Sequence, residues 1–103
     1  MFVTNLESTR SGRPVANQFV ISDKGHSYFQ SYRSLIADID HNANTVTIYP
    51  KWDYSVTTAK YFAVFLREYG LDDLAGAANV RKAIAAGEIA TKYTTWKVIA
   101  ANE

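Results

Sequence analysis

Two histidines are the side chains of this chain best suited to proton transfer. His26 follows Gly25 in a stretch typical of a tight turn, and His41 lies in the polar segment from Asp40 to Asn44. The sequence contains no nucleophile motif of the form G-x-S-x-G, and no spacing sets either histidine against a serine. We therefore expect two solvated loop histidines rather than a catalytic pair.

Acidic residues at alternate positions form a pattern similar to the start of a metal site. Asp38, Asp40 and Asn42 are spaced like the first ligands of a calcium-binding loop. The pattern then fails, because Ala43 stands where that loop needs glycine and Tyr49 where it needs a bidentate glutamate. The sequence therefore predicts a polar turn in which the Asp and Asn side chains bond to the backbone.

Other reactive or ligand-binding patterns are missing from the sequence. Cysteine is absent, which excludes disulfides, thiolate zinc sites and thiol nucleophiles. The five glycines are isolated, so the sequence has no glycine-rich phosphate loop. The neighbouring acids Asp72 and Asp73 are expected to cap a short turn. We therefore predict no enzymatic activity, no metal and no cofactor.

Aromatic residues are the remaining candidates for function. The chain has seven tyrosines and two tryptophans, and basic residues such as Arg10, Arg13 and Arg33 accompany them. Such residues can stack on nucleic-acid bases, and they are also common in protein interfaces. Eleven basic against ten acidic residues give a net charge of only +1, which favours a protein partner over nucleic acid.

Length and composition predict the domain organisation and the solubility of the chain. A chain of 103 residues with 48% hydrophobic residues is expected to fold as a single domain over residues 1–103. The first ten residues form no apolar leader and no apolar run approaches the length of a membrane span. We expect a soluble cytoplasmic protein that does not contact membranes.

The predicted fold class is α+β, with an antiparallel sheet of four to five strands packed against two helices. An N-terminal segment and loop (1–16) come first, strands follow over 17–49, helices over 55–87, and a final strand is favoured over a helix for 90–100. Whether the chain bends or reverses between Ser31 and Ser34 is left open. The strand segments are Asn17–Ser22, Ser27–Tyr32, Leu35–Asp40 and Thr45–Tyr49.

The helices are indicated by spacing and by their end signals. Phe62, Phe65, Leu66 and Tyr69 share one helical face. Ser55 or Thr57 can cap the start of this helix, and Gly70 ends it. A second helix is predicted over Ala77–Ala86, with Gly87 as its stop.

About half of the chain, from Asn17 to Leu66, is similar to known small proteins. It contains Ser-Tyr-Arg-Ser-Leu-Ile-Ala at residues 31–37 and Tyr-Ser-Val-Thr-Thr-Ala-Lys at residues 54–60. These segments resemble the Ser-Tyr-x-Ser/Thr-x-Ile-Ala and Tyr-Ser-x-Thr-Thr-x-Lys/His motifs of small phage and mobile-element proteins. That mostly uncharacterised group includes or neighbours anti-CRISPR proteins that act on type II systems, in particular type II-A. The resemblance implies an inhibitor that binds a host type II CRISPR nuclease.

The residues of these motifs have two interpretations. In one, the hydroxyls of Ser55, Thr57 and Thr58 form a structural joint between sheet and helix, and the phenols of Tyr32 and Tyr54 bond to it. In the other, the same joint carries a partner-binding surface. The residues of that surface are Tyr32, Arg33, Trp52, Tyr54 and Lys60.

Two further functions stay open beside the inhibitor. The first is a small phage nucleic-acid-binding protein that uses the aromatic and arginine residues. The second is an accessory phage protein that pairs with its own copy through an uncovered edge strand.

Overall fold

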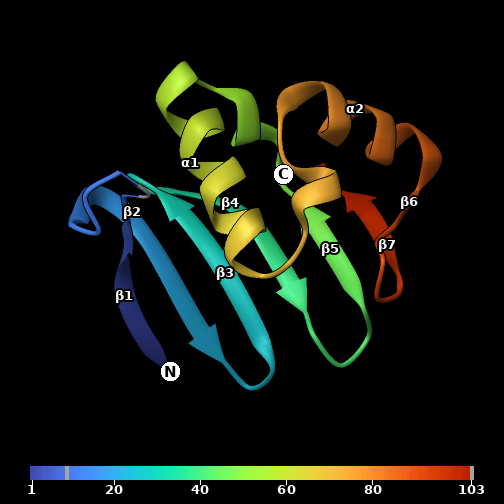
Figure 1. Cartoon of the computed structure of the whole chain (residues 1–103), viewed down its shortest axis with the longest axis horizontal. Helices are drawn as coiled ribbons and strands as arrows, with labels where there is room; N and C mark the ends of the chain where they lie inside the picture. Colours follow the sequence, from blue (N-terminus) through green and yellow to red (C-terminus); the bar gives the residue numbers. More distant parts are fainter. Residues whose placement is uncertain (9, 103) are drawn as a thin grey trace.

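The structure is a computed structural model that describes residues 1–8 and 10–102. Figure 1 shows a twisted sheet with two α-helices packed beside it. The elements in chain order are β1 (Phe2–Glu7), β2 (Pro14–Asp23), β3 (His26–Ser31), β4 (Ser34–Asp40), β5 (Thr45–Ile48), the 3-10 helix η1 (Pro50–Asp53), α1 (Val56–Glu68), the 3-10 helix η2 (Asp72–Leu74), α2 (Ala77–Ala86), β6 (Glu88–Ala90) and β7 (Thr95–Ala100).

Within the described residues the strands form one seven-stranded sheet in the order β1-β2-β3-β4-β5-β7-β6. Neighbouring strands are antiparallel except β5 and β7, which run parallel because the chain passes through both helices between them. The predicted α+β class is confirmed. The predicted count of four to five strands is wrong.

The two edge strands are the ones that the sequence did not indicate. Leu6 is the one buried residue of β1, and β6 is three residues long, so neither shows a hydrophobic alternation. The predicted N-terminal segment and loop (1–16) also contain more strand than expected, because β1 spans Phe2–Glu7 and β2 already begins at Pro14. Edge strands are held by backbone pairing rather than by burial, which leaves little signal in their side chains.

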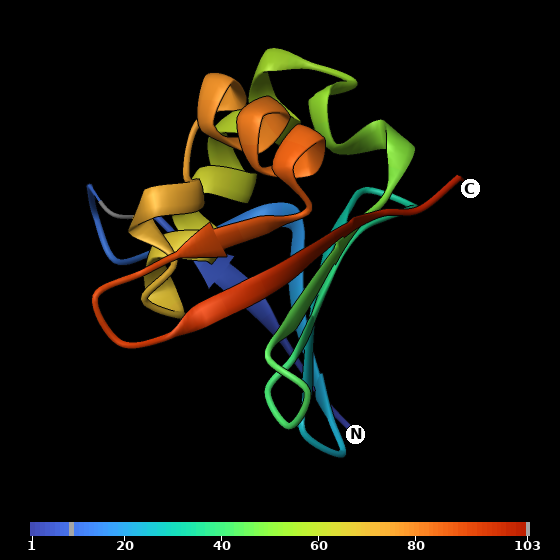
Figure 2. The same cartoon turned by 90° about the vertical axis from the view of Figure 1, so that its right-hand side faces the viewer.

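The core lies between the sheet and the helices, which cover one face of the sheet (Figure 2). Phe29 of β3 stacks on Phe62 and Phe65 of α1, with ring centroids 6.2 and 5.4 Å apart. The alternation of β3 directs Phe29 to this face, and the helical spacing directs the two α1 rings to meet it. Fully buried aliphatic side chains around them are Ile36, Ile39, Val46, Leu66, Leu71 and Leu74.

Two tight turns set the register of the central strands. The tight turn predicted before His26 is confirmed, and it forms the hairpin between β2 and β3 with Lys24 and Gly25 at φ 49° and 81°. The junction that the sequence left open, between Ser31 and Ser34, is a true reversal. Tyr32 takes a φ of 55° there, and its backbone N–H donates to the carbonyl of Asn17 at 2.7 Å.

Both predicted helices are confirmed with their end signals. Ser55 caps α1, because its Oγ accepts from the backbone N–H of Thr58 at 3.1 Å, whereas Thr57 is exposed. Gly70 follows α1 with a φ of 73°, and Gly87 ends α2 with a φ of 76°. Across the described part of the chain, no helix combines the length and apolarity needed to cross a membrane.

Candidate functional site

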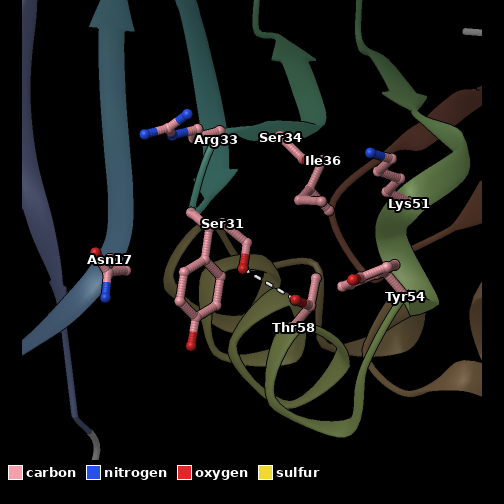
Figure 3. Close-up of a pocket in the computed structure, with 9 residues that line it drawn as sticks. Asn17, Ser31, Arg33, Ser34, Ile36, Lys51, Tyr54 and Thr58 are labelled. Carbon is pink, nitrogen blue, oxygen red and sulfur yellow. Dashed lines mark hydrogen bonds between the residues drawn. The ribbon is translucent and has the colours of Figure 1, made fainter.

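A cavity of about 530 Å³ lies where the β3–β4 turn, η1 and the first turn of α1 meet. Figure 3 shows Arg33 on one side of it, Lys51 and Tyr54 on the other, and Ser31 with Thr58 at its base. The residues that line the cavity are Asn17, Ser31, Tyr32, Arg33, Ser34, Ile36, Lys51, Tyr54 and Thr58.

A buried network of hydroxyls holds the walls of the cavity together. Ser31 Oγ on β3 lies 3.0 Å from Thr58 Oγ1 on α1, and both residues are 2% exposed. Ser55 Oγ donates to the same Thr58 oxygen at 3.1 Å while it caps the helix. These contacts support the interpretation of the second motif as a joint between sheet and helix.

The tyrosines of the motifs do not take part in that joint. Tyr32 is 51% and Tyr54 is 76% exposed, and within the described residues neither phenol forms a hydrogen bond. The expectation that their phenols bond to the start of the helix is therefore wrong. Tyr32 lies in the β3–β4 turn with a positive φ and Tyr54 directly follows η1, and both exposed residues line the cavity.

The charged residues of the cavity are both cationic. Arg33 belongs to the β3–β4 turn and Lys51 to η1, and the ammonium of Lys51 lies 5.9 Å from the centre of the Tyr54 ring. The ion pairs formed by the described residues involve neither cation. The cavity therefore carries a local positive charge that the near-zero net charge of the chain conceals.

The structure brings together three of the five predicted partner-binding residues. Tyr32, Arg33 and Tyr54 line the same cavity. Trp52 is 8% exposed and packs against Phe62, so its assignment to a contact surface is corrected to a core role. Lys60 is an exposed residue of α1 whose ammonium lies over the ring of Tyr61. It is not one of the residues that line the cavity.

Sequence reasoning missed Lys51, which supplies the second cation. Lys51 follows Pro50, shortly after the end of β5. The neighbouring strand β4 begins directly after Arg33. The sequence pattern could not show that these two stretches end at the same point of the sheet. It also missed Asn17, Ser34 and Ile36 as lining residues.

The histidines are more structured than expected. His26 Nδ1 lies 2.7 Å from Asp38 Oδ1, and His41 Nε2 lies 2.8 Å from Ser27 Oγ. The expectation of two solvated loop histidines without a serine contact is therefore wrong. Pairing of β3 with β4 sets His26 opposite Asp40 and makes Asp38 its diagonal neighbour on the same face, and the β4–β5 turn returns His41 to the start of β3.

The two histidine pairs lie on opposite sides of the sheet. His26 and Ser27 are consecutive residues of β3, so their side chains point to opposite faces. The hydrogen bond to Asp38 raises the pKa of His26 above its usual 6.5, and the nearby Asp40 acts in the same direction. The pairs therefore cannot form one Ser–His–Asp relay.

The acidic pattern of β4 is used within the protein. Asp40 Oδ1 accepts from the backbone N–H groups of Asn42 and Ala43 at 3.0 and 3.1 Å, as predicted for a polar turn. Asp38 is engaged by His26. Among the described residues, no group of three His, Asp or Glu side chains is arranged to hold a metal ion.

The other acidic pair does not cap its turn. Asp72 and Asp73 begin η2, but the residue at its N-cap position is Leu71 and no side-chain cap hydrogen bond forms there. The expectation of a cap is therefore wrong.

Residues 3–84 of the chain match a family described as a family of unknown function (DUF8033). The chain belongs to the DUF8033 family. The matched region contains the whole cavity lining and both α-helix starts, while β6 and β7 lie beyond it. No curated protein and no solved structure is significantly similar to this DUF8033 protein.

Proposed function

We propose that this protein is a non-enzymatic inhibitor that binds and blocks a type II CRISPR RNA-guided nuclease. The observation that carries the proposal is the position of the cavity. All nine lining residues fall between Asn17 and Leu66, the stretch that resembles small phage and mobile-element proteins that include or neighbour anti-CRISPR proteins. The proposed place of action is the cytoplasm of the bacterial host, where such a nuclease works.

The chemistry of the cavity supports binding rather than turnover. Its lining combines exposed tyrosines with arginine, the residue types that most often carry binding energy at protein interfaces. Among the residues that the structure describes, none of those lining the cavity is a His, Asp or Glu, the usual general acids and bases. Inhibition would follow from occlusion, with the aromatic rings as anchors and the cations setting orientation. The proposal invokes neither a metal nor a cofactor.

A cleavage assay with a panel of type II nucleases tests the proposal. Each nuclease is incubated with the protein before and after guide RNA is loaded, and DNA cleavage is then measured. We expect inhibition of at least one nuclease, and a dependence on the order of addition would identify the blocked step. Absence of inhibition across the panel in both orders would contradict the proposal.

A matched pair of variants locates the binding surface. In two places the ammonium of a lysine lies over a tyrosine ring: Lys51 over Tyr54, and Lys92 over Tyr93. Both tyrosines are 76% exposed. We expect Tyr54→Ala to weaken inhibition by at least about tenfold, as loss of an interface anchor does. Tyr93→Ala, on the β6–β7 loop, should leave inhibition unchanged. Equal effects of the two substitutions would refute the assignment of the surface.

The alternative function is binding of single-stranded nucleic acid. It is favoured by the exposed tyrosines beside two cations, with Arg10 and Arg13 in the β1–β2 loop at the same end of the sheet (Figure 1). Such a surface offers stacking together with phosphate contacts. This function predicts binding of labelled oligonucleotides that weakens steeply with salt, and a flat titration at low salt would exclude it.

A further inference from the structure

We infer that the cavity between the β3–β4 turn and η1 receives an acidic side chain, aspartate or glutamate, of the partner protein. This inference deepens the proposed function and rests on it, because it names the chemistry that the partner must present to Arg33 and Lys51.

Charge is the first reason. Arg33 and Lys51 both line the cavity, with the guanidinium of Arg33 extending toward the β2 side (Figure 3), and none of the lining residues that the structure describes carries a carboxylate. Among the described residues, no ion pair neutralises Arg33 or Lys51. An anion bound in the cavity gains a charge-assisted hydrogen bond from the ammonium of Lys51 and a favourable interaction with the positive charge of Arg33. Thr58 lies in the first turn of α1, whose helix dipole adds potential of the same sign.

The uncharged part of the lining fits the rest of an acidic side chain. Ile36 is fully buried behind the cavity, so the exposed rings of Tyr32 and Tyr54 supply the accessible apolar surface. Ser34 and Tyr54 supply hydroxyls that can donate to a carboxylate oxygen. Aspartate and glutamate combine a short apolar stem with a terminal carboxylate, so the stem can lie against the exposed tyrosine rings while the carboxylate approaches the ammonium of Lys51.

The count of cations favours a carboxylate over a nucleic-acid backbone. Two cations line the cavity, and the whole chain has a net charge of only +1. Nucleic-acid binding draws most of its affinity from many phosphate contacts and the counterions that they release. A single anionic group bound in the cavity beside Lys51 needs no such extended basic surface. A partner protein that offers one acidic residue within an apolar contact therefore matches the site better.

Nuclear magnetic resonance titration of the ¹⁵N-labelled protein tests the inference. The probes are an octaglutamate peptide and octathymidylate, each compared with chloride at the same ionic strength. We expect saturable shifts of the backbone amides of Ser34, Tyr54 and Thr58 with octaglutamate, and weaker binding of octathymidylate. Lys51→Ala should weaken octaglutamate binding about tenfold, the loss expected for one charge-assisted hydrogen bond. Lys92→Ala is the matched control and should bind as the unmodified protein does.

Three outcomes would overturn the inference. They are the absence of saturable shifts with octaglutamate, equal weakening by Lys51→Ala and Lys92→Ala, and binding of octathymidylate at least as tight as that of octaglutamate. The nuclease assay separates this failure from failure of the proposed function. Inhibition that survives both Lys51→Ala and Arg33→Ala would refute the acidic contact alone, whereas octaglutamate binding without inhibition of any nuclease would refute the proposed function alone.

Discussion

The hydroxyl of Thr58 connects the sheet to α1, and its removal tests how the walls of the cavity are held. Thr58→Val keeps the shape of the side chain and removes one oxygen. That oxygen bonds to Ser31 Oγ at 3.0 Å and accepts from Ser55 Oγ at 3.1 Å. Ser55 keeps its other role, because it still accepts from the backbone N–H of residue 58.

The size of the effect follows from what is left behind. Ser31 is 2% exposed, so water cannot replace its lost partner. A buried polar group without a partner costs about 1–3 kcal/mol, and we expect a loss of about 2 kcal/mol in the free energy of unfolding. For a domain of this size that corresponds to a fall in Tm on the order of 10 °C. Adding Ser31→Ala to Thr58→Val removes the orphaned hydroxyl and should restore most of the loss.

Urea unfolding followed by tryptophan fluorescence measures these differences, with stability taken from the midpoint at an unchanged m value. Thr57→Val is the matched control, because Thr57 is the exposed neighbour in the same turn and should change stability by less than about 0.5 kcal/mol. The reasoning is refuted if Thr58→Val behaves like Thr57→Val, or if Ser31→Ala adds its own loss instead of restoring stability.

Three further predictions concern the rest of the fold. Titration of His26 by nuclear magnetic resonance should give a pKa above 6.5, and Asp38→Asn should return it towards 6.5. Because the pKa of His26 is higher in the folded than in the unfolded protein, its pair with Asp38 stabilises the fold below pH 6.5. That contribution is lost as the pH rises through the folded pKa. Burial, with Glu7 nearby, raises the pKa of Glu68 above 4.5, so ionisation of Glu68 opposes folding above that pH; Glu68→Gln should raise the urea midpoint at pH 7 and have no effect at pH 3. Phe65→Ala removes a fully buried ring that stacks on Phe29 and should cost about 3–5 kcal/mol; a thermal scan that shows a Tm within a few degrees of the unmodified protein would contradict the described core.

The sequence by itself determined the elements whose signals are local. Strand alternation directs Phe29 to the core, and helical spacing does the same for Phe62 and Phe65, whichever element faces them. A capping hydroxyl at Ser55 and glycines at helix ends act within one or two turns of chain, so their effect is independent of the rest of the fold. These signals were enough for the α+β class and for both helices.

Tertiary structure alone decided the edges of the sheet and the composition of the cavity. β1 and β6 are held by pairing with a neighbouring strand, which needs no side-chain pattern of their own. Trp52 is of a residue type common in protein interfaces, but it belongs to the core because η1 packs its ring against Phe62 of α1. Lys51 and Arg33 are separated in sequence by the whole β4–β5 hairpin. Both line one cavity because β4 begins and β5 ends at the same end of the sheet. Periodicity fixes which face of an element is apolar, whereas long-range pairing fixes which residues meet across it.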